Sequence, residues 1–159
     1  MLRLLLDANI YGEFIDEEGN EEIAKRIEDL KKEEKILIHN FKVIRDELRN
    51  ARAIKTLNLY DKLTANTIHT PDGKVEDLAD LYFNNYKEKG GIQSKTQNFM
   101  NDLRIIAFAS IKGLDIVCSE DVKAFHTKLI QDTYKQINRR FPYRTPDIIS
   151  LADLKKAWL

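Results

Sequence analysis

Four acidic residues stand next to apolar stretches of the sequence, and carboxylates in such a setting can hold metal ions. They are Asp7 after "LRLLL", Glu47 within "KVIRDELRN", Asp102 at the start of "DLRIIAFAS", and Asp121 shortly after "IVCS". If these stretches converge, the like charges raise one another's pKa and cost stability unless a cation intervenes. Mg²⁺ and Mn²⁺ prefer carboxylate and water oxygens. The residue types therefore predict a divalent-metal site suited to phosphodiester hydrolysis.

The elements that must position these acids are predicted from apolar spacing. Short apolar runs predict strands at 2–6, 35–39 and 114–119, the first buried on both faces as in a parallel sheet. Helical spacing predicts helices at 21–30, 42–59, 74–89, 96–113, 121–141 and 151–159. This alternation predicts an α/β sheet covered by helices, with a binding crevice outside the carboxyl ends of the strands.

Length and composition favour one globular α/β domain spanning residues 1–159. Lys plus Arg number 26 and Asp plus Glu also number 26, so the formal net charge is zero. Binding to nucleic acid would therefore have to depend on local basic patches or on bound metal. A single cysteine, Cys118, cannot form an internal disulfide, and the first ten residues are too short and too soon charged for a signal peptide or membrane span. We therefore expect a cytoplasmic protein without membrane association.

The order and context of the four acids resemble the PIN-domain ribonucleases, especially the VapC-like toxins of VapBC toxin–antitoxin systems, along nearly the whole chain. In that family a hydrophobic strand precedes Asp-x-Asn, a helix carries the second acid before Leu, a third Asp is followed by Ile and Ala at fixed spacing, and a strand ends in Ser-x-Asp. The matching residues here are Asp7-Ala8-Asn9, Ile44 with Glu47-Leu48, Asp102 with Ile105, Ala107 and Ala109, and Ser119-Glu120-Asp121.

This resemblance implies a PIN-like three-layer α/β/α sandwich with a mostly parallel central sheet. It also implies a metal-dependent endoribonuclease that uses Mg²⁺ or Mn²⁺ on an RNA substrate, forms a homodimer and binds an antitoxin protein. The catalytic and metal-binding residues would be Asp7, Glu47, Asp102 and Asp121, with Asn9 and Ser119 in support.

Two of the four proposed site acids have a neighbouring acid that could take their place in the site. Asp46 stands next to Glu47, and the segment after Gly113 is one residue longer than in many family members, which makes Glu120 an alternative to Asp121. Each acid also has a structural interpretation, because Asp commonly caps helices and Glu commonly pairs with neighbouring Arg on a helix surface.

Three functional alternatives follow. The first is a non-catalytic α/β interaction scaffold, in which the acids only cap helices and form ion pairs. The second is a PIN nuclease of RNA processing rather than a toxin, and the third is metal-dependent cleavage of DNA. Residues 60–100 make the chain longer than a minimal toxin, and we expect this region to bear on dimerisation or RNA access.

Overall fold

The computed structural model describes all 159 residues, and a five-stranded parallel sheet lies at its centre. The strands are β1 (Leu2–Leu6), β2 (Ile36–Phe41), β3 (Thr64–His69), β4 (Ile116–Cys118) and β5 (Asp147–Ile149). Their spatial order is β3-β2-β1-β4-β5, and every neighbouring pair is parallel. The chain thus moves outward from β1 on one side, then crosses back and continues with β4 and β5 on the other.

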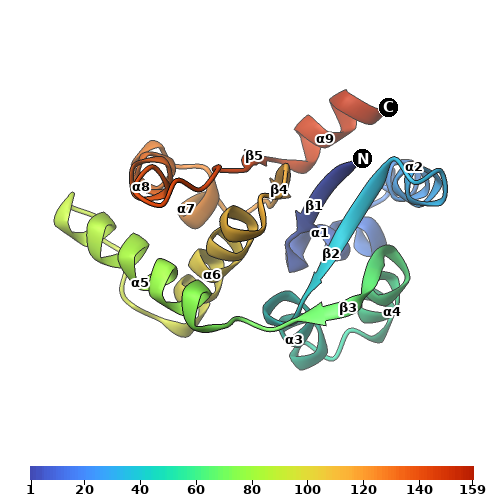
Figure 1. Cartoon of the computed structure of the whole chain (residues 1–159). Helices are drawn as coiled ribbons and strands as arrows, with labels where there is room; N and C mark the ends of the chain where they lie inside the picture. The colour runs from blue at the N-terminus through green and yellow to red at the C-terminus, as the bar shows by residue number, and fades with distance from the viewer.

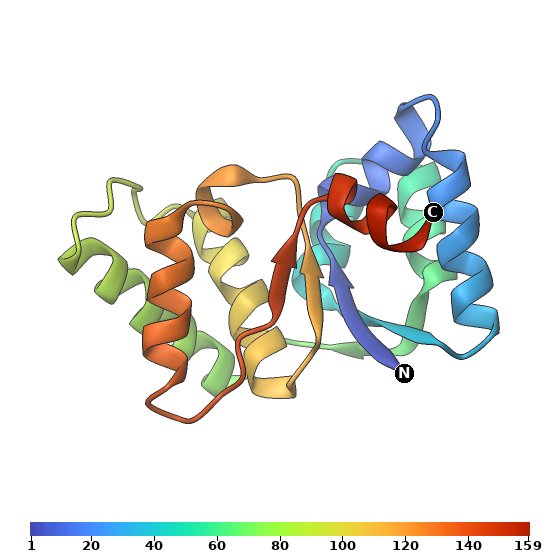
Figure 2. The same cartoon turned by 90° about the horizontal axis from the view of Figure 1, so that it is seen from above.

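Nine helices connect the strands and cover the sheet (Figure 1). They are α1 (Ala8–Asp16), α2 (Glu21–Lys32), α3 (Lys42–Asn50), α4 (Ile54–Leu63), α5 (Gly73–Glu88), α6 (Gln97–Lys112), α7 (Val122–Phe125), α8 (Lys128–Asn138) and α9 (Leu151–Trp158). Figure 2 shows α5, α6 and α8 together on one side of the strands, with α2 and α9 on the other. This arrangement confirms the predicted three-layer α/β/α sandwich, and its sheet is wholly parallel.

The core is continuous from the sheet into both helical layers. It forms one cluster of 41 buried hydrophobic residues, in which Leu4 and Leu5 of β1 are completely buried. Phe41 at the end of β2 stacks on Phe108 of α6, with ring centroids 4.3 Å apart. Because the central strand is covered on both faces, whatever follows it is held on a rigid base.

Two predicted long helices are each two helices in the structure, so those boundaries were wrong. The expected helix at 42–59 is interrupted between α3 and α4, where Arg52 adopts a left-handed φ of 56°. The expected helix at 121–141 is interrupted between α7 and α8, and Thr127 restarts it by accepting a hydrogen bond from the Ile130 backbone N–H. Neither break contains Gly or Pro, so the sequence carried no strong signal for it.

Three elements were not predicted. α1 begins directly after Asp7, and the strands β3 and β5 lie at the two edges of the sheet. The end of α6 was predicted correctly, since Gly113 caps it with a left-handed φ of 64°.

No helix in the structure combines the length and the apolarity needed to cross a membrane.

Candidate active site

The four predicted acids line one small polar hollow at the carboxyl end of the sheet. Its volume is about 140 Å³, and none of its lining residues is hydrophobic. Asp7 comes from the end of β1, Glu47 from α3, Asp102 from α6 and Asp121 from the residue before α7. Three asparagines, Asn9, Asn98 and Asn101, complete the lining. The hollow lies where β1 and β4 are neighbours, at the point where the strand order reverses, which is the usual binding position in such sheets.

Asp7 is buried and held by several hydrogen bonds. Its backbone N–H donates to the Cys118 carbonyl at 2.9 Å, which extends the β1–β4 pairing by one step. One carboxylate oxygen accepts from the Ala8 N–H at 2.8 Å as the cap of α1, and the other accepts from the Ser119 hydroxyl at 2.7 Å. Burial raises the pKa of Asp7, and the hydrogen bond from Ser119 opposes that rise.

Ser119 and Asn9 form the frame around Asp7. The Asn9 amide nitrogen donates to both the Asp7 carboxylate and the Ser119 hydroxyl, at 3.3 Å each. The Asn9 amide oxygen in turn accepts from the Glu120 backbone N–H at 3.2 Å, and the Ser119 hydroxyl accepts from the Asp121 N–H at 3.1 Å. The two residues therefore link the segment after β1 to the segment after β4 and set the orientation of the Asp7 carboxylate.

The side chains of Asp121 and Glu120 point in different directions, the first into the hollow and the second toward the start of α9. Asp121 lines the hollow and also caps α7, where one of its oxygens accepts from the backbone N–H of Lys123 at 2.9 Å. Glu120 is exposed, and its carboxylate accepts from the Leu151 N–H at the start of α9 at 2.5 Å. The structure thus brings Asp121 to the other acids and directs Glu120 elsewhere.

A similar separation holds for Asp46 and Glu47. Asp46 pairs with Lys42 at 2.5 Å and with Arg49 at 3.4 Å, and it does not line the acidic hollow. Glu47 is exposed as a residue, but its side chain reaches the rim of the hollow and has neither a hydrogen bond nor an ion pair. Reduced solvation there, followed by the charges of Asp7 and Asp121, raises the pKa of Glu47.

Asp102 is the most strongly perturbed acid of the hollow. Burial first, and then the charges of Asp7, Asp121 and Glu47, raise its pKa to about 9. Its carboxylate has no hydrogen bond and no basic partner, and no Lys or Arg lines the hollow. Carboxylates that repel one another without a counter-charge are the condition that a bound cation relieves.

The donor set fits a cation that keeps part of its water shell. No three His, Cys, Asp or Glu side chains lie close enough together to form a complete ligand set by themselves. Mg²⁺ typically binds through only one or two protein carboxylates, with waters and substrate phosphates supplying the other ligands. An open hollow lined by carboxylate and amide oxygens suits that mode of binding.

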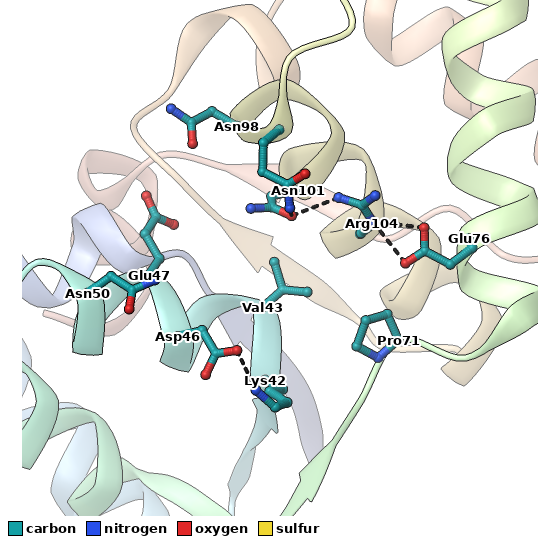
Figure 3. Close-up of a pocket in the computed structure, with 11 residues that line it drawn as sticks. Lys42, Val43, Asp46, Glu47, Asn50, Pro71, Glu76, Asn98, Asn101 and Arg104 are labelled. Atoms are coloured by element: carbon teal, nitrogen blue, oxygen red, sulfur yellow. Dashed lines mark hydrogen bonds and ion pairs between the residues drawn. The ribbon is translucent and has the colours of Figure 1, made fainter.

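Sequence reasoning missed two residues of the hollow, Asn98 and Asn101. They lie four and one residues before Asp102 on α6, and the spacing of 98, 101 and 102 places all three on one helix face. That spacing was the available signal. Asn98, Asn101 and Glu47 also line a larger adjoining groove of about 620 Å³ between α3, Pro71 and α6 (Figure 3).

Several solved protein chains share this fold. A chain of VapBC2 from Rickettsia felis, crystallised with a DNA fragment from its promoter, superposes with a TM-score of 0.61 at 14% identity, covering 94% of this chain and 98% of that chain. A chain of FitAcB from Neisseria gonorrhoeae superposes with a TM-score of 0.55 at 17% identity, covering 92% and 96%. No protein-family model matches the sequence, and neither does any curated protein. At such low identity, the likeness establishes a common fold along nearly the whole chain.

Proposed function

We propose that this protein is an endoribonuclease that depends on Mg²⁺ or Mn²⁺. The observation that carries the proposal is the convergence of four carboxylates, from four separate elements, on one hollow that has no counter-charge. Ion-pair networks with a purely structural role also shift the pKa values of carboxylates, but in such networks each acid has a basic partner. Here burial, and then the charges of Asp7, Asp121 and Glu47, raise the pKa of Asp102, and no basic side chain lines the hollow to lower it.

The residues of the hollow have distinct parts in this proposal. The cation would lie among Asp7, Glu47, Asp102 and Asp121, bound directly by one or two of these carboxylates and through its waters by the others. Ser119 and Asn9 hold the Asp7 carboxylate in its orientation. When bound, the cation supplies an activated water and neutralises the charge that develops on the phosphate oxygens. No protein nucleophile is needed. The Ser119 hydroxyl is buried and donates to Asp7, while burial of the Cys118 thiol raises its pKa.

The biological setting is proposed from the fold. VapBC2 has this fold in a complex that binds its promoter DNA, and VapBC systems are the ones that the sequence motifs resemble. We therefore propose that this chain belongs to a toxin–antitoxin pair, acts as a homodimer and is inhibited by an antitoxin protein. A role in RNA processing uses the same chemistry and differs in its RNA target.

One observation favours the scaffold alternative. Asp7 and Asp121 both cap helices, so part of the acidic set has a structural use that needs no metal. Capping does not explain Asp102 or Glu47, which bind no backbone group. The two interpretations differ in their dependence on metal.

The test compares RNA cleavage by the parent protein, Asp7→Asn, Asp102→Asn and the control Asp132→Asn. Asn caps a helix as well as Asp, so Asp7→Asn keeps α1 intact. Asp132 lies on α8 and pairs with Lys128, away from the hollow. We expect cleavage of single-stranded RNA in Mn²⁺ by the parent and the control, no cleavage in EDTA, and background rates for the two site variants. Equal rates of RNA cleavage by all four proteins would contradict the proposal.

Calorimetry gives a second measurement that does not depend on finding the right RNA. Mn²⁺ titrated into the parent protein should bind, and binding should be lost in Asp102→Asn but kept in Asp132→Asn. If Mn²⁺ does not bind even with RNA present, the scaffold alternative is favoured.

A further inference from the structure

The groove beside the acidic hollow is polar but offers little free positive charge. Its two cationic side chains are both paired with carboxylates of the same groove: Lys42 with Asp46, and Arg104 with Glu76. Amides supply most of the other donors, since Asn50, Gln97, Asn98 and Asn101 all line it. Any ligand that continues from the hollow into the groove therefore meets neutral amide donors before it meets a free cation.

Arg104 fixes the orientation of one of these amides. Its Nε lies 3.0 Å from each carboxylate oxygen of Glu76, and its Nη1 donates to Oδ1 of Asn101 at 2.8 Å (Figure 3). A guanidinium has donors only, so the edge of the Asn101 amide that faces Arg104 must be the oxygen. The two N–H donors of Asn101 are thereby turned away from Arg104.

Asn101 stands where the groove and the acidic hollow join. It lines both spaces, as do Asn98 and Glu47, and it immediately precedes Asp102 on α6. Figure 3 shows it between Arg104 on one side and the helix that carries Glu47 on the other. Its amide nitrogen donates to no protein group, although the oxygen of the same amide is held firmly. A donor that is oriented but has no partner, next to the acids, is suited to an acceptor on a ligand.

A neutral donor has a physical advantage at this position. A Lys or Arg in place of Asn101 would pair with Asp102 or Glu47 and compete with the metal for their carboxylates. An amide can bind a phosphate oxygen without that competition. The same reasoning explains why Arg104 is kept on the far side of Asn101, where Glu76 neutralises it.

We propose that the Asn101 amide binds a non-bridging oxygen of a phosphate next to the cleaved one, on a single-stranded RNA that runs from the hollow into the groove. Arg104 and Glu76 are positioning residues that act through Asn101. This inference rests on the proposed nuclease function and adds to it a binding residue and a path for the strand.

The test measures RNA binding separately from cleavage. In the cleavage-blocked Asp7→Asn background with Mn²⁺, fluorescence anisotropy of a labelled 12-nucleotide RNA is compared with and without Asn101→Ala. One lost hydrogen bond to a charged group should weaken binding about 10-fold. Arg104→Met should give a similar loss, and the double variant should lose no more than either single variant, because both act through one contact. Asn84→Ala, exposed on α5 outside the groove, is the matched control and should bind normally.

Salt dependence distinguishes this role from a general electrostatic one. The slope of log affinity against log salt counts phosphates neutralised by Lys and Arg, so Asn101→Ala should leave it unchanged. Asn101→Leu keeps a side chain of similar size and adds no charge but removes the amide donors, so it should also bind weakly and with an unchanged salt slope. It serves as the second variant if Asn101→Ala does not fold.

The outcomes separate the two proposals. If the parent cleaves RNA with metal but the Asn101 variants bind RNA normally, this inference is overturned and the nuclease function stands. If neither metal-dependent cleavage nor RNA binding occurs in the parent, both are overturned. Additive losses in the Asn101→Ala, Arg104→Met double variant would show that Arg104 binds RNA directly, which overturns its positioning role.

Discussion

The Ser119 hydroxyl donates a 2.7 Å hydrogen bond to the buried carboxylate of Asp7, across 112 positions of sequence. It joins the ends of β1 and β4, which are neighbouring strands at the reversal of the strand order. Without this bond, that Asp7 oxygen would keep only the longer 3.3 Å contact with the Asn9 amide. Ser119 therefore contributes both to the stability of the fold and to the orientation of the Asp7 carboxylate in the site.

Ser119→Ala should weaken both. Leaving a buried carboxylate oxygen short of a donor costs about 1–3 kcal/mol of unfolding free energy, measured by urea denaturation at pH 7. Loss of the residue that orients a metal ligand typically reduces metal affinity or activity about 10- to 100-fold. Ser94→Ala, in the exposed loop before α6, is the control and should change neither. Full activity in Ser119→Ala would contradict an orienting role for Ser119.

Asp102 should make the metal-free protein less stable as the pH rises. Its pKa is about 9 in the folded state, against about 3.9 for an unfolded chain. Between those values the folded protein keeps a proton that the unfolded chain has released, so stability falls as pH increases from about 4 to about 9. Asp102→Asn removes this contribution. In EDTA, the variant should melt at a higher temperature than the parent at pH 8 and at nearly the same temperature near pH 4. Parallel melting curves across that range would contradict the assignment.

Divalent metal should reverse that loss of stability. A ligand that binds only the folded state stabilises it by about 2.7 kcal/mol at 100 times its dissociation constant. Mn²⁺ should therefore raise the melting temperature of the parent at pH 7 to 8, and EDTA should abolish the rise. The double variant Asp7→Asn, Asp102→Asn should show no rise, while Asp132→Asn should behave as the parent. A rise of equal size in all three proteins would indicate a metal site elsewhere.

Asp121 and Glu120 should differ sharply when substituted. Asp121→Asn keeps the cap of α7 but removes a charge from the hollow, so we expect a folded protein with little metal-dependent cleavage. Glu120→Ala removes the acceptor for the Leu151 N–H, so it should cost about 0.5–1.5 kcal/mol of stability and leave cleavage unchanged. RNA cleavage and urea denaturation of both variants check this. The reverse pattern would place Glu120 in the site.

Much of the fold could be predicted because local patterns carry it. The apolar run before Asp7, the helical spacing before Gly113 and the apolar run before Ser119 each predict an element within a few residues of its observed position. The edge strands β3 and β5 were missed because one is largely polar and exposed and the other has only three residues. The break at Arg52 was missed because a left-handed residue other than Gly or Asn has no clear sequence signal.

The sequence by itself determined which acids border the buried elements, and it carried the resemblance that predicted the fold. Only the tertiary structure decided that Asp121 rather than Glu120 reaches the hollow, and that Arg104 binds the Asn101 amide oxygen and leaves its N–H donors facing away from Arg104. The reason is physical. Spacing along the chain encodes which face of an element a side chain occupies, whereas contacts between distant elements depend on strand order and on the few hydrogen bonds that join them. Asp7 and Ser119 meet because β1 and β4 are neighbours, and nothing local to either residue specifies that.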